Sequence, residues 1–189
     1  NAFTKIKTAD NVVIYIDPTT VNSFSDSADI VLITHEHSDH NEINRLKLKK
    51  NCTIIRAADA LSGGVYRNFT INGIQIQAFP AYNSYHQKNL SVGYIITFNG
   101  IKIYHSGDTG LIQEMSQLKD SSITYALLPM DGTYTMTPAE AVIASERIGA
   151  AHYIPMHTSP PSGYNQTRID QFNIENKLVL KNGDSIELN

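Results

Sequence analysis

Four side chains that can bind a metal ion stand within six residues in the first third of the chain. They lie in the segment THEHSDH at residues 34–40, directly after an apolar run. In an extended segment His35 and His37 point the same way and can reach one cation, while Asp39 and His40 turn toward a second point. This spacing indicates two metal ions side by side.

A polar turn that contains histidines is the alternative interpretation of this segment. Three imidazoles and a carboxylate so close together are hard to explain as packing, because buried polar groups without partners cost free energy and offer little apolar area. We therefore favour metal binding. Glu36 is the exception, since we expect it to point away, toward the loop or solvent.

Two further candidate clusters each follow a predicted strand. Asp108 follows the run at 101–104 and is preceded by the flexible Gly107, so it can present both carboxylate oxygens, as a ligand that bridges two cations must. The alternative for Asp108 is a helix N-cap. We expect His105 to orient a ligand. His157 follows the run at 153–155 and is a third candidate ligand.

Short runs rich in β-branched residues recur along the chain and predict strands. They cover residues 12–16, 29–33, 74–79, 92–98, 101–104, 125–128 and 153–155. Asn99-Gly100 separates two of these runs and predicts a type I′ turn, because that turn needs positive φ at both central residues. Strands 92–98 and 101–104 are therefore expected to pair antiparallel.

Helices are expected to be fewer. Thr137, Pro138 and Glu140 form a capping box with proline at the first helical position, and Gly149 ends the helix they begin. Weaker helical patterns cover residues 41–48, 110–118 and 166–172. The basic run at 45–50 is expected to present a solvated face of a short helix. Strand-rich stretches with isolated helices favour a mixed sheet sandwich with helices on its outer faces.

Length, charge and composition bound the function. The 189 residues fit one domain, which we expect to span 1–189. A formal charge of -3 without a dense basic stripe gives no footprint for a nucleic acid. No apolar stretch approaches the ~20 residues of a membrane helix, so no membrane partner is expected. A small-molecule substrate is the expected partner, and the oligomeric state is left open.

Cys52 stands alone and lies in an apolar run, as a small core residue does. A lone cysteine forms no internal disulfide, so it gives no indication of the redox compartment. The protein is expected to be either cytoplasmic or exported with a leader removed.

The chain resembles metal-dependent hydrolases of the metallo-β-lactamase fold, and specifically their small lactonase- and phosphodiesterase-like branch. The resemblance covers nearly the whole length. It rests on residues 17–18, 34–40, 80–83, 104–109, 129–136 and 154–157, of which 34–40 is the most specific. It implies an α/β fold, a four-layer αββα sandwich with the site at one edge between the two sheets.

The resemblance also implies a ligand set. In this set, His35 and His37 bind the first metal, and Asp39, His40 and His157 bind the second metal. Asp108 bridges the two metals. Zinc is the default metal for such nitrogen-rich sites, and manganese or iron also suits a bridging carboxylate. We expect two divalent ions.

One position departs from the resemblance. Family members usually supply a third histidine to the first metal after the strand that ends near Ala81, and here Asn83 stands near that place. We predict that His86 completes the first metal, because imidazole suits zinc better than an asparagine carbonyl does. Otherwise His86 faces substrate or supports a ligand, as Asn83 does if it is not itself the third ligand. If neither residue binds, the first metal is weak or absent. Thr133 and Tyr134 line the substrate pocket or belong to an ordinary loop.

These expectations lead to a hydrolase in which two cations generate hydroxide from a shared water, so that no serine or cysteine nucleophile is needed. Asp108 and Asp39 are the expected catalytic residues, with Asp39 also orienting the nucleophile. A carboxylic ester of the lactone type or a phosphodiester is the expected substrate. The alternative is a metal-binding protein of the same fold, with an incomplete first site and little or no turnover.

Overall fold

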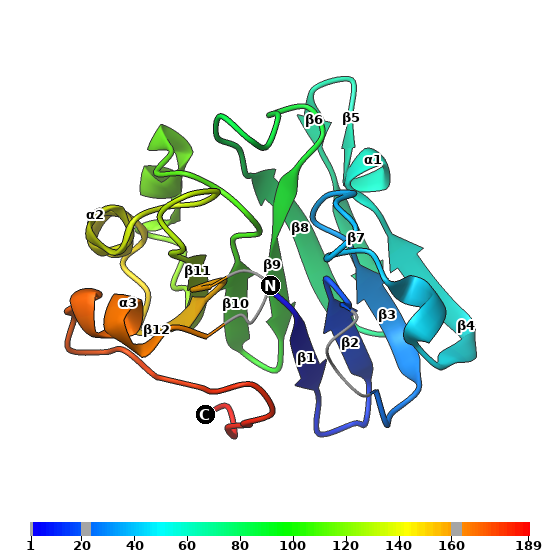
Figure 1. Cartoon of the computed structure of the whole chain (residues 1–189). Helices are drawn as coiled ribbons and strands as arrows, with labels where there is room; N and C mark the ends of the chain where they lie inside the picture. Colours follow the sequence, from blue (N-terminus) through cyan, green and yellow to red (C-terminus); the bar gives the residue numbers. More distant parts are fainter. Residues whose placement is uncertain (1, 20–23, 160–163) are drawn as a thin grey trace.

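The computed structural model describes residues 2–19, 24–159 and 164–189. Two sheets face each other at its centre (Figure 1). The smaller sheet contains, in spatial order, β1 (Thr4–Lys7), β2 (Val13–Ile16), β3 (Ala28–Leu32) and β4 (Leu48–Ile55). The larger sheet contains, in spatial order, β12 (His152–Met156), β11 (Tyr125–Pro129), β10 (Ile101–His105), β9 (Val92–Phe98), β8 (Ile74–Pro80) and β7 (Asn68–Ile71). A small hairpin pairs β5 (Leu61–Ser62) with β6 (Val65–Tyr66).

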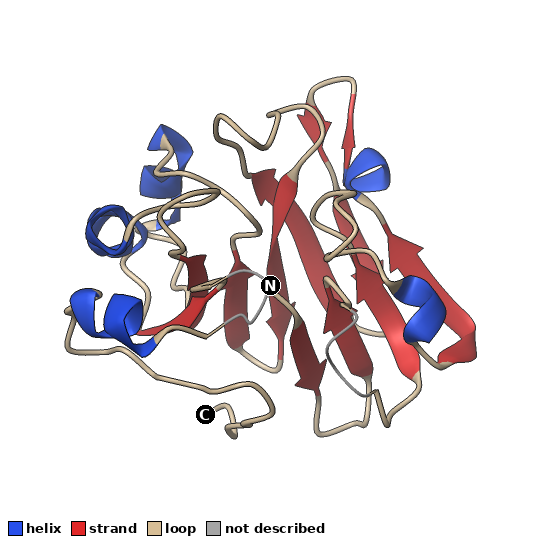
Figure 2. Ribbon diagram, in the orientation of Figure 1, coloured by secondary structure: helices blue, strands red, loops and turns tan. Residues whose placement is uncertain are grey.

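Helices cover the outer faces of the two sheets (Figure 2). The larger sheet carries α2 (Pro138–Ile148), α3 (Gln166–Gln171) and the 3-10 helix η2 (Gln113–Leu118). The smaller sheet has the 3-10 helix η1 (Ile43–Arg45) on its outer face, whereas the short helix α1 (Ala57–Ala60) after β4 buries Ala57 and Ala60 in the core between the sheets. The order helix, sheet, sheet, helix is the αββα sandwich that the sequence predicts. No helix in the described ranges is long and apolar enough to span a membrane.

Alternating side chains of each strand supply two different layers of core. In β2, Ile14 and Ile16 pack between the sheets, whereas Val13 and Tyr15 pack on the outer face against η1 and its neighbours. This follows from the two-residue period of a strand. In β10, Tyr104 likewise points to the helices that cover the larger sheet. Because both faces are covered, the polar side chains that need room collect at the ends of the strands.

The predicted hairpin and the predicted helix cap are both confirmed. Strands β9 and β10 pair antiparallel, and Asn99 and Gly100 between them have φ values of 48° and 79°. The Thr137 hydroxyl accepts from the Glu140 N–H, and the Glu140 carboxylate accepts from the Thr137 N–H. The seven predicted strands are all present, with ends that differ by a few residues.

The helix predicted over residues 41–48 is wrong. It is reduced to the single 3-10 turn η1, and the second half of the basic run at 45–50 belongs to β4. Parallel pairing of β4 with the free edge of β3 outweighs the weak helical pattern, because it satisfies a whole row of main-chain groups. The basic side chains are exposed, but only Lys49 and Lys50 are on the strand. Cys52 lies on this strand and is half-buried.

The helix predicted over residues 110–118 is shorter than expected and has 3-10 geometry. It begins at Gln113, and its N-cap is Ile112, which makes no side-chain capping bond. Asp108 lies too far upstream to cap it. The alternative explanation for Asp108 is therefore wrong, and a buried carboxylate is left that secondary structure does not explain.

Candidate metal centre

The ends of several strands bring the candidate ligands to one edge of the sandwich. β2 and β3 run parallel, as do β10, β11 and β12, so the carboxyl ends of each set lie together. The loop after β3 carries residues 35–40, and the loop after β8 carries His86. Asp108 follows β10, and His157 follows β12 directly. Residues from the two sheets therefore meet in one place.

The first group of possible ligands comprises His35, His37 and His86. One nitrogen of each lies within 4.8 Å of the others. The Nε2 atoms of His35 and His86 are buried and have no hydrogen-bond partner among the described residues. His37 is exposed to solvent. Two buried lone-pair nitrogens beside a third imidazole form the kind of set that binds a transition metal.

The second group comprises Asp39, His40 and His157, again with ligand atoms within 4.8 Å of one another. The two imidazoles are almost fully buried, whereas the side chain of Asp39 is 51% exposed. The group thus has a closed histidine side and an open carboxylate side. An arrangement of this kind leaves room for a substrate atom near the metal.

Asp108 lies between the two groups. Its Oδ2 atom is 3.4 Å from His40 Nε2, 3.2 Å from His157 Nε2 and 3.7 Å from His86 Nε2. Its Oδ1 atom is buried and accepts no hydrogen bond from the described part of the chain. This carboxylate therefore touches histidines of both groups, which is the position that a bridging ligand takes.

Two buried carboxylates orient the histidines of the second group. Asp17 Oδ2 lies 2.9 Å from His40 Nδ1, and Asp131 Oδ2 lies 2.8 Å from His157 Nδ1. Each bond holds the ring with Nε2 directed at Asp108. Asp17, His35 and His40 also lie close enough to form a third possible ligand group. Both oxygens of Asp17 are engaged by its neighbours, so it serves as support for the ligands.

Two neutral groups orient the histidines of the first group. The Thr34 hydroxyl donates to Asp17 Oδ2 at 2.6 Å, so it can only accept from His35 Nδ1, which lies 2.9 Å away. Asn83 Oδ1 lies 3.1 Å from His86 Nδ1. The four buried imidazoles of the two groups therefore all have Nδ1 engaged, and in each the Nε2 atom is the one left to face a metal.

The charges of the centre are strongly coupled. Burial opposes protonation of His40, but the carboxylates of Asp108 and Asp17 outweigh it and raise the pKa of this imidazole to about 10. Burial likewise opposes ionisation of Asp108, yet the neighbouring imidazoles, His40 first, hold the pKa of its carboxyl well below the ordinary value. Burial lowers the pKa of His35 to about 3. A cation at the centre would replace the proton that holds His40 and Asp108 together.

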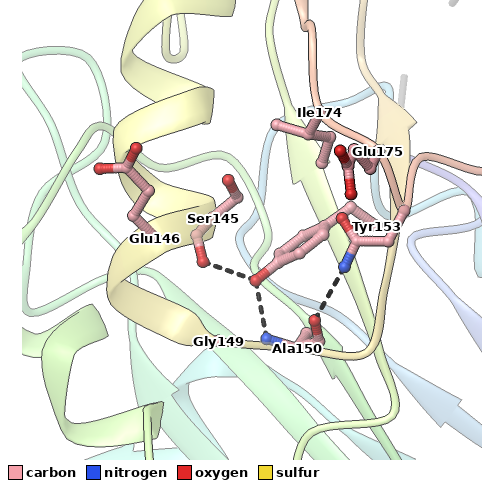
Figure 3. Close-up of a pocket in the computed structure, with 8 residues that line it drawn as sticks. Ser145, Glu146, Gly149, Ala150, Tyr153, Ile174 and Glu175 are labelled. Carbon is pink, nitrogen blue, oxygen red and sulfur yellow. Dashed lines mark hydrogen bonds between the residues drawn. The ribbon is translucent and has the colours of Figure 1, made fainter.

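A hollow of about 550 Å³ lies elsewhere, between the end of α2 and residues 174–176 (Figure 3). There the Tyr153 hydroxyl donates to the Ser145 carbonyl and accepts from the Ala150 N–H. Asn176 donates to the carbonyls of residues 150 and 151. These bonds join α2 to β12, and no histidine lines the hollow. The histidine cluster, rather than this hollow, is the candidate site.

Comparison with known proteins identifies the family of the chain. A family model described as a β-lactamase superfamily domain matches residues 1–157. The chain belongs to the metallo-β-lactamase superfamily. A metal-dependent hydrolase of Methanoculleus marisnigri is 32% identical over 85% of this chain and 82% of its own. A metal-dependent hydrolase of Nitratidesulfovibrio vulgaris is 35% identical over 76% of this chain and 69% of its own. The metallo hydrolase Igni18 of Ignicoccus hospitalis aligns over 98% of this chain and 94% of its own, with a TM-score of 0.74 and 25% identity.

These matches make the chain a metal-dependent hydrolase of the metallo-β-lactamase superfamily.

In this hydrolase, the hydrogen bonds of His105 go to the main chain. Its Nε2 donates to the Ala2 carbonyl at 2.8 Å, so its Nδ1 accepts from the Gly107 N–H at 3.3 Å. His105 therefore supports the main chain just before Asp108, and among the described residues it makes no hydrogen bond to a ligand side chain. Thr133 and Tyr134 are exposed, and their N–H groups donate to Asp131 Oδ1.

Sequence reasoning assigned no role to Asp17, Thr34 or Asp131, the residues that orient three of the histidines. A signal was available, because Asp17 comes one residue and Asp131 two residues after the end of a strand, at the edge where the ligands lie. Asp17 and His157 also have positive φ, at 49° and 45°, which is uncommon for residues other than glycine. Such strain collects at functional sites.

Proposed function

We propose that the chain is a dinuclear metallohydrolase, with zinc as the default metal, that cleaves a carboxylic ester of the lactone type or a phosphodiester. One observation carries this proposal. The buried Nε2 atoms of His35 and His86 and the buried Oδ1 of Asp108 lack hydrogen-bond partners in the described chain, although the Nδ1 atom of each buried ligand histidine has one. Leaving such atoms unpaired costs free energy, which metal coordination recovers.

The proposed ligands divide between two ions. His35, His37 and His86 would hold the first, and Asp39, His40 and His157 would hold the second, with Asp108 between them. When bound, two such ions lower the pKa of a shared water and polarise the carbonyl or phosphoryl oxygen of the substrate. Manganese and iron also suit this donor set.

The chain's own residues then set the geometry. Asp17 and Asp131 hold two imidazoles in place before substrate arrives, so little reorganisation accompanies the reaction. Asp39 is the exposed member of its group, and its carboxylate can accept a hydrogen bond from the nucleophilic water. The buried carboxylates of Asp17, Asp108 and Asp131 are all engaged with histidines, so solvent would protonate the leaving group.

A metal-binding protein without turnover is less well supported. That alternative required an incomplete first group, because Asn83 stands where the resemblance predicts a histidine. In the structure His86 lies with His35 and His37, so three imidazoles surround this position. The observation favours a complete centre.

Hydrolysis by the zinc-loaded protein tests the proposal on a panel of lactones and phosphodiesters. We expect turnover of at least one class by the wild type and a loss of at least a hundredfold in Asp108→Ala, because the carboxylate between the ions is removed. The matched control is Asp26→Ala, which removes a half-exposed aspartate just before β3 that pairs with Lys5 and belongs to neither ligand group, so this variant should retain activity. Circular dichroism checks that both variants fold. Equal turnover by Asp108→Ala and the wild type would exclude the bridge.

A further inference from the structure

The side chain of Asn83 has a fixed orientation, because its partners are main-chain groups. Its Oδ1 accepts from the N–H of Tyr85 at 2.8 Å and from the N–H of His86 at 3.0 Å. A main-chain N–H can only donate, so the atom in this position is the amide oxygen. The opposite end, Nδ2, donates to the Tyr134 carbonyl at 2.9 Å. The amide cannot be turned around without losing three bonds.

This orientation determines which nitrogen of His86 carries its proton. His86 Nδ1 lies 3.1 Å from the same Asn83 oxygen, which has no proton to give. Nδ1 must therefore donate, and in the neutral ring Nε2 keeps its lone pair. That Nε2 atom is buried, lacks a hydrogen-bond partner in the described residues and lies beside His35 and His37. Asn83 thus presets His86 as a ligand.

The other end of Asn83 reaches the loop that orients His157. The Tyr134 N–H donates to Asp131 Oδ1 at 2.7 Å, and Asp131 Oδ2 holds His157 Nδ1 at 2.8 Å. The rings of Tyr85 and Tyr134 also meet edge to face, with centroids 5.2 Å apart. A continuous chain of hydrogen bonds therefore runs from a histidine of the first group to a histidine of the second.

We propose that Asn83 is a positioning residue that fixes His86 as the third ligand of the first metal and ties this ligand to the Asp131 loop of the second metal. The inference rests on the proposed metal centre. It also gives a role to the residue that departs from the resemblance: Asn83 orients the ligand and does not itself coordinate. The uncharged amide accepts from Nδ1 as carboxylates do for His40 and His157.

Substitution by alanine and by aspartate separates the two halves of this role. Asn83→Ala removes the acceptor and the donor. Asn83→Asp keeps an acceptor for His86 Nδ1 but has no N–H for the Tyr134 carbonyl. The matched control is Asn176→Ala, which removes an asparagine that also donates to main-chain carbonyls but lines the hollow beside α2, away from the histidines. His86→Ala removes a proposed ligand of the first metal, so the zinc-binding step that this variant loses is assigned to the first metal.

Two measurements are made on each protein. Zinc titration against a chromophoric chelator gives stepwise affinities, and nitrogen-15 NMR of the metal-free protein gives the tautomer of His86. We expect Asn83→Ala to weaken the step lost in His86→Ala by about tenfold and to mix the His86 tautomers. Asn83→Asp should restore the affinity of this step to within about threefold of the wild type and should restore a single His86 tautomer. The affinity of the other zinc-binding step should fall about threefold in both Asn83 variants. Asn176→Ala should match the wild type.

The outcomes distinguish this inference from the proposed function. A wild-type protein that binds no zinc overturns the metal centre itself, and the inference with it. If the wild type binds zinc and Asn83→Ala keeps both the first-step affinity and a single tautomer, the orienting role is excluded. An unchanged second step in both Asn83 variants excludes the tie to the Asp131 loop.

Discussion

At the scale of single residues, the second group of ligands depends on carboxylates that lie far from it in sequence. Asp17 precedes His40 by 23 positions and Asp131 precedes His157 by 26. The sequence groups the histidines, because their spacing within one loop and their place after strands are local features. It does not reveal which carboxylate each ring faces, since that depends on how two sheets pack.

Asp17→Asn is predicted to weaken zinc binding by about tenfold to a hundredfold. The carboxylate accepts from the Thr34 N–H, the Thr34 hydroxyl and His40 Nδ1. An amide would place an N–H against one of these donors, so at least one ligand would lose its support. Chelator competition with zinc measures the effect. Asp26→Asn, at an exposed ion pair, is the control, and equal affinity in the two variants would refute the role given to Asp17.

At the scale of elements, sequence patterns predicted most of the larger sheet and less of the smaller one. The hairpin turn at Asn99-Gly100 and the capping box at Thr137 are local signals that tertiary contacts did not override. The strand β4 was missed because its first half carries lysines, as edge strands often do, and resembles a basic helix. Short elements such as α1 and β5 have too few residues to show a period.

The loop that carries Asp108 packs closely against the loop that carries His35. Gly107 has φ of 63°, and a side chain there would come within 2.8 Å of the Val92 carbonyl and 3.1 Å of Thr34 Cβ. Thr34 immediately precedes His35 and accepts its Nδ1 hydrogen bond. The absence of a side chain at this glycine therefore sets the distance between Asp108 and the first group of ligands.

Gly107→Ala is predicted to lower both stability and zinc affinity, whereas Gly100→Ala should lower stability alone. Both glycines have positive φ, which costs alanine roughly 1–2 kcal/mol, but a side chain at Gly100 meets nothing within 4 Å. The difference in stability and zinc affinity between the two variants therefore measures the effect of the close packing of Gly107 against Val92 and Thr34. Thermal melts and zinc titrations on both proteins provide the data. If the two variants lose the same stability and bind zinc equally, the packing argument fails.

At the scale of the whole molecule, the two sheets meet at a cluster of buried charges, so metal content should govern stability. Zinc at a hundredfold excess over its Kd stabilises the fold by about 2.7 kcal/mol per site, or roughly 5–10 °C in Tm for a chain of this size. We expect a drop of at least this size when a chelator removes the metal. Calorimetry of chelated and reloaded protein measures it, and an unchanged Tm would contradict a bound metal.

The same measurement should depend on pH in the metal-free protein. The pKa of His40 is raised from 6.5 to about 10, because Asp108 and Asp17 outweigh the cost of burial. The free energy of unfolding that protonated His40 contributes is fully present below about pH 6.5 and is lost as pH rises through about 10. The Tm of chelated protein should therefore fall from pH 7 to pH 9. Zinc-loaded protein should not follow this fall, because a ligand nitrogen carries no proton.

The most direct test of the central claim is the number of zinc ions per chain, measured by elemental analysis after reconstitution and gel filtration. We predict about two ions in the wild type, because one group of three histidines and another of two histidines and an aspartate lie on either side of Asp108. We predict about one ion in His86→Ala. A value near zero in the wild type, no higher than in His37→Ala, would contradict the metal centre altogether.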